Sequence, residues 1–495
     1  MEIKDFLDIV FQKKKLELSK DNWKKIEDCY NYLEELIQSK KTIYGINTGF
    51  GALGSEKVPI ENLEELQKNL IYHLVTGVGD KFSKIESRGI LLARIHCLSL
   101  GHSAVSSETL GEMMRLLEID LIPVIPEQGT VGASGDLTPL AHLALAMMGE
   151  GEFYFEDRIV NSEEIQKQKN YKPIKWKGRD ALAIVNGTSA MTAIACLNSF
   201  YANRIFEISL LHSFLYSEIL EAKTSAFSKE FFEVRQHNGF EKVINKFINW
   251  IQDSNRFQRE NEVLDQKNIQ DPYTIRCIPQ IYGSIYDIIS YHDTIVKTEL
   301  NSVTDNPIFF PEKKSLVHGG NFYGSPIAFV SDTLKNGLIS IASHIERKIA
   351  RLTDKDLNRG LPAFLSSGRI GLDSGFMGLQ VSASSLLAEL RGLAIPMSIQ
   401  TIPTNANNQD IVPMGTIAAR KTRDVAEIIF SLLGMEAIVL AQGIELSNMN
   451  KGYSKLALEF LGRIRKISKK MNEDRPIYKE IETIAEQYKK YSFEI

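Results

Sequence analysis

Long stretches in which apolar residues recur at every third or fourth position are the strongest constraint on the fold of this chain. They cover residues 84–118, 190–223, 279–301, 326–352 and 416–450. Such spacing places apolar side chains along one face of an α-helix, or all around a helix that is fully buried. Because these faces must be covered in water, we predict a mainly α-helical fold with a bundle of long helices.

Strand signals are few and short. Runs of β-branched and aromatic residues beside turn residues occur at 41–44, 151–155 and 307–310. Each run is long enough for a local hairpin but not for a large sheet. We therefore expect small hairpins, and a small mixed part on the N-terminal side of the chain.

The chain of 495 residues is long enough for more than one domain, although no Pro- or Ser-rich linker divides it. The long helical run that begins near residue 200 suggests an N-terminal domain at 1–200 and a helical bundle domain at 201–495. The last stretch, 454–494, keeps the helical spacing and carries many charges. We expect it to be a helix that stays partly solvated.

Charge and cysteine content argue against several classes of protein. Lys and Arg number 58 against 62 Asp and Glu, and the formal charge of -4 gives little attraction for a phosphate backbone. The 4 cysteines lie far apart and form no C-x-x-C pair, which argues against a zinc site and a disulfide framework. We therefore expect no nucleic-acid partner, no metal and a reducing, cytoplasmic location.

Two segments bear on export and on membranes. Residues 1–20 carry acids and a lysine cluster where a signal peptide needs an uninterrupted apolar run. The most apolar long stretch, 425–446, is interrupted by Glu427, Glu436 and Glu445, and charge is costly inside a bilayer. We therefore expect a buried helix rather than a membrane span, and no export.

The loop GTVGASGDLTPLAH, residues 129–142, surrounds a serine with very small residues. A bend at Ala133, Ser134 and Gly135 can bring the Gly135 nitrogen against the Ala133 carbonyl carbon, because glycine has no side chain to block the approach. Closure of that bond, with loss of two water molecules, would leave an imidazolone ring with an exocyclic methylidene. One water is released from the ring, and the other contains the Ser134 hydroxyl. Such a group is a carbon electrophile that no standard side chain supplies.

The same loop has a simpler explanation as the start of a helix. Thr138 precedes Pro139, as an N-cap residue precedes a proline at the first helical position. On composition alone this explanation is the more common one. Other segments of the chain therefore have to decide between the two.

The segment 129–142 resembles the prosthetic-group segment of the aromatic amino acid ammonia-lyases, which include histidine, phenylalanine and tyrosine ammonia-lyases and related aminomutases. In that family the Ala-Ser-Gly triplet cyclises by itself into 4-methylideneimidazol-5-one (MIO), which here would form from residues 133–135. The resemblance extends over about residues 44–416 and implies the long-helix bundle of the histidine ammonia-lyase type. It also implies that no metal and no diffusible cofactor is required.

Further segments resemble the family in the expected order. The resemblance implies that Tyr44, in YGINTGFG, is the catalytic base, and that Asn186, in NGTSA, faces the prosthetic group. It implies that Arg276, in QDPYTIRCIPQ, holds the substrate carboxylate. It implies that Tyr273, in that last segment, is a further catalytic residue. The substrate-binding positions that it implies are Gln270 in the same segment, Asn321 and Phe322 in GGNFYG, and Gln409 in NNQDIVPMGT, where the family lines the ring pocket.

These residue types suit an elimination of ammonia. A tyrosine such as Tyr44 can remove the β-proton as a phenolate. The planar guanidinium of Arg276 can hold a carboxylate through two parallel hydrogen bonds, although an ordinary ion pair is a more common use of arginine. The amides and the other aromatic residues could equally be structural.

The residues expected around the substrate ring favour tyrosine. In NLIYHLVTGVG, the pair His73-Leu74 resembles that of tyrosine-type members, where phenylalanine-type members have Phe-Leu and histidine-type members Ser-His. An imidazole can hydrogen-bond a phenol, and a substrate that leaves it unsatisfied is penalised. Gln409 is neutral where histidine-type members have glutamate. We expect L-tyrosine, and also L-phenylalanine, to give coumarate or cinnamate; a histidine ammonia-lyase giving urocanate and an aromatic 2,3-aminomutase remain alternatives.

Two other classes of protein fit less well. GFGALG, residues 49–54, is a literal G-x-G-x-x-G, but a loop with Pro59 follows where a dinucleotide-binding motif needs a helix. A helical scaffold without activity would be expected to lack the triplet, Tyr44 or Arg276, and all are present. The resemblance also implies a homotetramer, joined through the bundle domain, in which several subunits contribute to each active site.

Overall fold

The computed structural model describes residues 1–39, 42–156, 158–169, 171–259, 270–369, 371–447 and 452–493. Contacts divide the chain into two compact units. Unit 1 comprises Met1–Asn198, Asp293–Asp332 and Pro396–Arg420, and unit 2 comprises Ser199–His292, Thr333–Ile395 and Lys421–Ile495. The expected division into domains at 1–200 and 201–495 stays a prediction.

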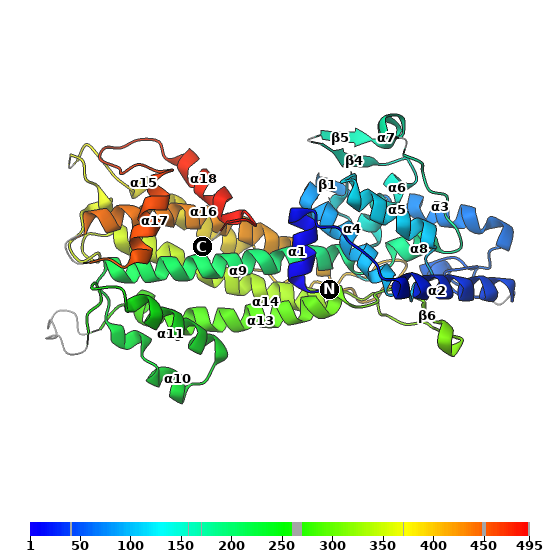
Figure 1. Cartoon of the computed structure of the whole chain (residues 1–495), viewed down its shortest axis with the longest axis horizontal. Coiled ribbons are helices and arrows are strands. Elements are labelled where there is room, and N and C mark those ends of the chain that lie inside the picture. The colour runs from blue at the N-terminus through cyan, green and yellow to red at the C-terminus, as the bar shows by residue number, and fades with distance from the viewer. Residues whose placement is uncertain are drawn as a thin grey trace. The chain divides into compact units, whose positions relative to one another are not determined.

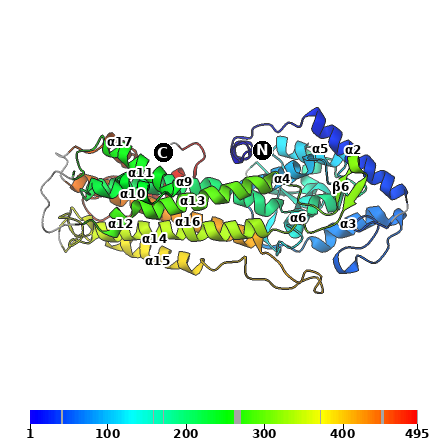
Figure 2. The same cartoon turned by 90° about the horizontal axis from the view of Figure 1, so that it is seen from below.

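The long periodic stretches form long helices, so the predicted mainly α-helical fold is confirmed. They are α9 (Ser189–Ile219), α13 (Ile278–Leu300), α14 (Ser325–Thr353) and α16 (Gly415–Leu446). The parts of these helices that belong to unit 2 run side by side (Figure 1, Figure 2). Their facing side chains form one apolar core, in which Phe214, Leu338 and Val439 are fully buried. Burial of this kind stabilises the bundle more than helix propensity does.

Two of the predicted helical stretches are each divided into two helices. The stretch 84–118 becomes α4 (Lys84–Ser99) and α5 (Ser107–Glu118), and 454–494 contains α17 (Lys455–Arg465) and α18 (Tyr478–Lys489). Gly101, at φ +79, turns the chain after α4, and Pro476 precedes α18. Glycine allows the positive φ of such a turn, and proline is disfavoured inside a helix because it lacks the backbone N–H. Residues 448–450 and 494, at the ends of two predicted stretches, lie outside the described residues.

The shorter elements fall into both units. Those of unit 1 include α1 (Ile3–Gln12), α2 (Lys20–Gln38), α3 (Leu63–Leu74), α6 (Leu137–Met147), α7 (Ser162–Lys169) and α8 (Asp180–Val185). Those of unit 2 include α10 (Glu230–Val234), α11 (Asn238–Ile251), α12 (Tyr273–Arg276) and α15 (Met377–Gly392). In unit 1, α3, α6 and α8 pack against one another, and they carry several of the residues of interest. In the described part of the chain, no helix combines the length and the apolar character that crossing a bilayer requires.

Small antiparallel sheets complete unit 1. The strands pair as β1 (Val78–Lys81) with β3 (Pro126–Gln128), β4 (Glu152–Phe155) with β2 (Ile122–Pro123) and β5 (Arg158–Asn161), and β6 (Ile308–Phe310) with β7 (Ser315–Val317). The hairpins expected at 151–155 and 307–310 are therefore confirmed. In the first of them Phe153 lies opposite Val160, and in the second Phe309 lies opposite Leu316.

The prediction of a strand at 41–44 is wrong for residues 42–44, which the structure describes. Residue 41 lies outside the described residues, and Ile43 begins a turn rather than a strand. The Asn47 side chain accepts a hydrogen bond from the Ile43 backbone nitrogen at 2.7 Å, and the Asn47 nitrogen donates to the Ile43 carbonyl at 3.2 Å. Asparagine favours such local turns over a strand ladder.

A buried ion pair joins α8 to the segment that precedes β6. Arg179, at the start of α8, donates to both carboxylate oxygens of Asp305, at 2.9 and 3.0 Å. Neither side chain is exposed to solvent. A pair of this geometry is held by two parallel hydrogen bonds, and removing one partner leaves an uncompensated buried charge.

We predict that Asp305→Asn destabilises the protein by about 3 kcal/mol or more, because the Arg179 guanidinium would stay buried without its counter-charge. The matched control is Glu118→Gln, which removes an exposed partner of Lys15 at 3.6 Å and should cost at most about 1 kcal/mol. Urea unfolding midpoints of the three proteins measure both effects. Equal midpoint shifts for the two variants would contradict the structural role assigned to Arg179 and Asp305.

Candidate active site

The Ser134 loop lies at the wall of a cavity in unit 1 with a volume of about 580 Å³. This volume is within the range of small-molecule sites. Sequence-predicted residues that line it are Tyr44, His73, Leu74, Ala133, Ser134, Asn186, Phe322 and Gln409. The structure thus brings together residues that lie up to hundreds of positions apart in sequence.

The third residue of the triplet has room for no side chain. Gly135 has φ +68, and a Cβ built on it would lie 2.1 Å from the Gly187 carbonyl oxygen. That oxygen also accepts a hydrogen bond from the Asp136 nitrogen at 2.7 Å, so it cannot easily move away. The backbone of Ala133 pairs with that of Gly135 in a sharp bend. This place in the loop therefore admits only glycine, the residue type that the predicted ring closure requires at position 135.

Both polar groups of Ser134 receive a hydrogen bond from a side-chain amide. Asn186 Nδ2 donates to the Ser134 carbonyl at 3.1 Å, and Gln409 Nε2 donates to Ser134 Oγ at 2.9 Å. Thr404 Oγ1 donates to Gln409 Oε1 at 2.6 Å, which leaves the amide nitrogen pointing at the serine. Gln409, expected at the substrate ring, thus also contacts the triplet directly.

The glycine-rich loop GFGALG folds over Tyr44. The Gly51 nitrogen donates to the Tyr44 hydroxyl oxygen at 3.0 Å, and a Cβ on Gly54 would lie 2.7 Å from the tyrosine ring. After Gly54 the chain forms a loop, and α3 begins only at Leu63. These glycines accommodate a tyrosine ring, and the strand and helix of a dinucleotide-binding motif are absent from this segment.

His73 and Leu74 end helix α3 beside the cavity. The Nδ1 atom of His73 lies 3.0 Å from the carbonyl oxygen of Asn69. Because a carbonyl can only accept, Nδ1 carries the proton, and Nε2 of the neutral ring is an acceptor. The imidazole can therefore accept a hydrogen bond from a donor group on a substrate ring.

Asn321 is the one predicted residue of GGNFYG that does not line the cavity. Its Nδ2 donates to the Val303 carbonyl at 2.6 Å, which ties its loop to the chain before β6. Its neighbours Phe322 and Tyr323 do line the cavity. Gly135 is likewise not among the lining residues, because it is packed against Gly187.

Gln270, Tyr273 and Arg276 lie in unit 2 and line a separate, open cavity of about 500 Å³. The Arg276 guanidinium lies 4.4 Å from the centre of the Tyr273 ring and donates to Gln270 Oε1. Among the residues that the structure describes, no carboxylate pairs with Arg276. Its contacts there are neutral, so the ordinary ion pair considered from the sequence is not found.

Comparisons with known proteins identify the family. The family described as aromatic amino acid lyase matches residues 1–466. The chain belongs to the aromatic amino acid lyase family. The predicted family, its fold class and its carbon–nitrogen lyase chemistry are thereby confirmed.

Three relatives show how similar this lyase is to named members. It is 37% identical over 493 residues to a probable histidine ammonia-lyase of Thermoplasma acidophilum, covering 100% of this chain and 97% of the relative. It is 39% identical to a tyrosine ammonia-lyase of Cereibacter sphaeroides, covering 92% and 89%. The solved structure of a tyrosine aminomutase from Streptomyces globisporus matches with a TM-score of 0.94 and 31% identity, covering 99% of this chain and 95% of that one.

Asp136 is a site residue of this lyase that the sequence argument missed. It is fully buried directly after the triplet, accepts a hydrogen bond from the Met191 nitrogen at 2.8 Å, and bonds the Thr416 hydroxyl. Burial raises its pKa to about 6, against the opposing effect of these hydrogen bonds. The one acidic residue in the segment 129–142 was the available signal.

The helix start predicted at Thr138 is wrong. Helix α6 begins at Leu137 with Asp136 as the N-cap residue, and Thr138 lies inside the helix. The cause is the Asp136 carbonyl, which accepts the first helical hydrogen bond from the Leu140 nitrogen at 3.1 Å. The lyase therefore starts this helix immediately after the triplet.

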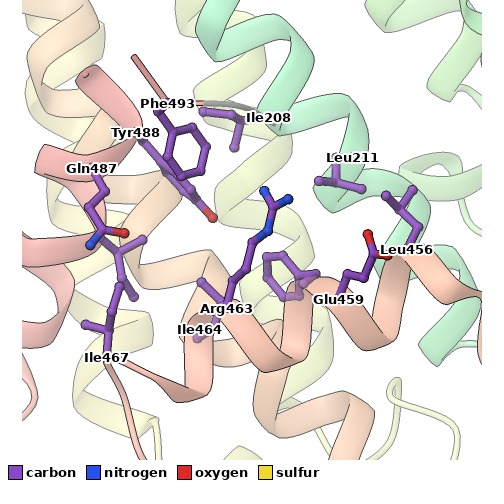
Figure 3. A pocket seen from close by; sticks show the side chains of 12 residues that line it. Ile208, Leu211, Leu456, Glu459, Arg463, Ile464, Ile467, Gln487, Tyr488 and Phe493 are labelled. Atoms are coloured by element: carbon purple, nitrogen blue, oxygen red, sulfur yellow. The ribbon is translucent and has the colours of Figure 1, made fainter. Parts of the chain in front are cut away.

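Another cavity, in unit 2, is too small to be the substrate site of this lyase. Figure 3 shows apolar side chains there, including Ile208 of α9 and Ile464 of α17, which face Tyr488 of α18. Its volume is about 70 Å³, whereas a cavity that binds benzene measures about 150 Å³. The described part of the chain also contains no group of three or more His, Cys, Asp or Glu residues that could hold a metal ion.

A half-buried histidine supports the loop that follows His73 and Leu74. The Gly77 nitrogen donates to His142 Nε2 at 3.1 Å, so that nitrogen must be unprotonated. Burial and the charge of Lys81 lower the pKa of His142 to about 4. Because this pKa lies below the unfolded value, the stability that the neutral ring contributes is complete above about pH 6.5 and is lost as the pH falls towards about 4.

We predict that His142→Gln reduces the acid sensitivity of this lyase, because a glutamine carbonyl can accept from Gly77 without titrating. The measurement compares urea unfolding midpoints at neutral pH and at about pH 5. The control is exposed His237→Gln, which should keep the wild-type difference between the two pH values. An unchanged pH difference in the His142 variant would show that this ring does not contribute.

Proposed function

We propose that this lyase eliminates ammonia from an aromatic L-amino acid at an MIO group formed from Ala133, Ser134 and Gly135, and releases the trans-2-enoic acid. The observation that carries the proposal is the triplet itself, bent at Gly135 and held at both polar groups of Ser134. It lies in a cavity of small-molecule size beside Tyr44. No diffusible cofactor and no metal take part in the proposed reaction.

The residues around the triplet suit the proposed group. When formed, MIO supplies a carbon electrophile that is conjugated to the carbonyl group contributed by Ser134. Asn186 already donates to that carbonyl at 3.1 Å, and a donor at this position draws electron density towards the oxygen. Gln409 donates to the hydroxyl that leaves as water, which makes it a better leaving group. Gly135 leaves its own nitrogen unshielded for ring closure.

Tyr44 is the proposed base that takes the β-proton. Its hydroxyl oxygen accepts a hydrogen bond from the Gly51 nitrogen, and a backbone donor at this atom stabilises negative charge on it. The oxygen and Ser134 border the same cavity. A substrate between them could present its β-carbon to one and its amino group to the other.

The substrate carboxylate is assigned to Arg276. Its contacts in the described chain are the neutral Gln270 amide and the Tyr273 ring, so its charge is available for an anion. Because these residues line a different cavity from Ser134 within one chain, we propose a homotetramer in which they complete the active site of another copy.

Exposed apolar side chains support association. Phe329, Val381, Ile399 and Ile402 are all more than half exposed, and large apolar side chains left in water favour contact with another surface. A second copy of the chain would cover such side chains. The proposed tetramer would therefore also cover apolar surface that a monomer leaves in contact with water.

L-Tyrosine is the proposed substrate, with L-phenylalanine also accepted. His73 Nε2 is an acceptor because Nδ1 bonds Asn69, and the phenol of tyrosine is a matching donor. The imidazole of histidine is a donor as well, and the relatives of this lyase include a probable histidine ammonia-lyase of nearly equal identity. Histidine, giving urocanate, is therefore the second candidate. An aromatic 2,3-aminomutase is the other alternative, since one of the similar solved structures is named a tyrosine aminomutase.

The experiment offers L-tyrosine, L-phenylalanine and L-histidine separately to the purified protein. The ultraviolet absorbance of each conjugated acid measures elimination, and chromatography detects any β-amino acid. Ser134→Ala should lower turnover by a factor on the order of 10³ or more, because the electrophile cannot form. Ser302→Ala, at a half-buried serine that does not line the cavity, should leave turnover unchanged. Wild-type turnover in the Ser134 variant, or no product from any of the three amino acids, would contradict the proposal.

Replacing His73 tests the choice of substrate. His73→Phe should shift the ratio of kcat/KM for tyrosine over that for phenylalanine by about tenfold or more towards phenylalanine, because the phenol loses its acceptor. Tyr72→Phe is the matched control: its ring lies outside the cavity, where its hydroxyl bonds Glu150. An unchanged ratio in the His73 variant, or histidine as the best substrate of the wild type, would overturn the choice of tyrosine.

A further inference from the structure

A continuous chain of polar side chains runs through the apolar core of unit 2. The charged residues of this polar chain begin at His212, whose Nδ1 lies 2.9 Å from Glu436 Oε2. The other oxygen of Glu436 lies 2.7 Å from the Lys348 ammonium, which donates to Ser213 Oγ at 3.0 Å. All these side chains are fully buried. The core therefore contains a charged network where apolar residues would be expected.

The polar chain continues from Ser213 to helix α12. The hydroxyl oxygens of Ser213 and Tyr282 are 3.0 Å apart, and the Tyr282 hydroxyl lies 3.1 Å from His344 Nδ1. The other ring nitrogen of His344, Nε2, is 2.9 Å from the Thr274 carbonyl oxygen. At the opposite end, His212 Nε2 contacts the Tyr488 hydroxyl at 3.1 Å. The polar chain thus extends from α18 to α12.

The proton positions near Thr274 follow from the partners. A carbonyl can only accept, so His344 Nε2 carries a proton and donates to Thr274. Burial and the Lys348 charge lower the pKa of His344 far below its ordinary value, so the ring is neutral. Nδ1 is therefore an acceptor, and the Tyr282 hydroxyl donates to it. One arrangement of donors and acceptors is thereby fixed at this end of the network.

Thr274 is held at both of its polar groups. Besides the bond from His344 to its carbonyl, its side-chain hydroxyl lies 2.9 Å from the Tyr216 hydroxyl. Helix α12 has only 4 residues, Tyr273–Arg276, and no side-chain cap. So short a helix is not stable by itself. Its position must come from tertiary contacts: the packing of Ile275, which is fully buried in the core, and these two directed, partly buried hydrogen bonds.

The same turn presents Tyr273 and Arg276 on its outer side. Tyr273 is 67% exposed, and the Arg276 guanidinium is stacked on its ring. The inner contacts of Thr274 therefore contribute to where both groups lie. We propose that His344, supported by the polar chain behind it, is a positioning residue that holds α12 in the place from which Arg276 binds the substrate carboxylate. This inference rests on the proposed function for the assignment of Arg276.

The cost of the network supports a role beyond packing. Burial of an ion pair such as Lys348 with Glu436 is often no more stabilising than apolar residues of similar volume, and its directional contacts can instead specify one arrangement. An apolar residue at His344 would fill the core but would leave the Thr274 carbonyl without its donor. Stability and positioning can therefore be separated by the choice of substitution.

The test compares His344→Leu with His344→Gln, whose amide nitrogen can still donate to Thr274. The Leu variant should lower kcat/KM for the amino acid by about tenfold or more, mainly through KM, because Arg276 contributes to substrate binding. The Gln variant should restore most of it. The matched control is His292→Leu, which replaces a fully buried histidine on α13 in unit 2 and should leave KM unchanged.

Hydrogen exchange supplies a readout that does not need turnover. Amides of residues 273–277, such as those of Arg276 and Cys277 that close α12 at 3.0 and 3.1 Å, should exchange about tenfold faster or more in the His344→Leu variant. They should keep the wild-type rate in His344→Gln and His292→Leu.

The two proposals fail in distinguishable ways. Wild-type protein that turns over none of the amino acids contradicts the proposed function, while faster exchange confined to His344→Leu would still support the role of His344 at α12. Wild-type exchange and KM in a folded His344→Leu variant would overturn the positioning role alone. Equal changes in the Leu and Gln variants would also overturn it.

Discussion

The packing of Gly135 against the Gly187 carbonyl is the contact on which the candidate active site depends. A Cβ at residue 135 would lie 2.1 Å from that oxygen, so the backbone reaches this place only without a side chain. The bend sets Ser134 at the cavity wall, where Asn186 and Gln409 can reach its carbonyl and its hydroxyl. Because α6 starts directly after the bend, the helix and the loop are fixed together.

Buried polar groups recur wherever the structure holds a segment of the candidate site. Asp136 bonds Met191 and Thr416 beside the triplet, Arg179 and Asp305 join the start of α8 to the chain before β6, and His344 holds α12 through Thr274. Burial of each such group is unfavourable unless well-aligned hydrogen bonds or an ion pair compensate for the lost hydration. Directional contacts of this kind keep loops in place where apolar packing alone would allow several arrangements.

The fold was largely predictable from sequence because its long helices are periodic over many turns. α13 and α14 lie within one residue of their predicted bounds at each end, since summed hydrophobic spacing is a strong signal. Local turns were less predictable. At Ile43 the Asn47 side chain competes with a strand, and at Thr138 the backbone bond to Asp136 starts the helix early. Such outcomes depend on single hydrogen bonds that composition does not reveal.

For the site, sequence motifs indicated residues that the structure gathers around one cavity, such as Tyr44, His73 and Gln409. They could not show that Arg276 lines another cavity, because motifs carry no distances.

Whether the triplet becomes a carbon electrophile is a question about covalent structure. Mass spectrometry of the proteolytic peptide that contains residues 133–135 answers it. We expect a peptide lighter than its encoded sequence by two water molecules, and the full encoded mass for the same peptide from Ser134→Ala. Active wild-type protein whose peptide has its full encoded mass would show that the triplet does not form this electrophile.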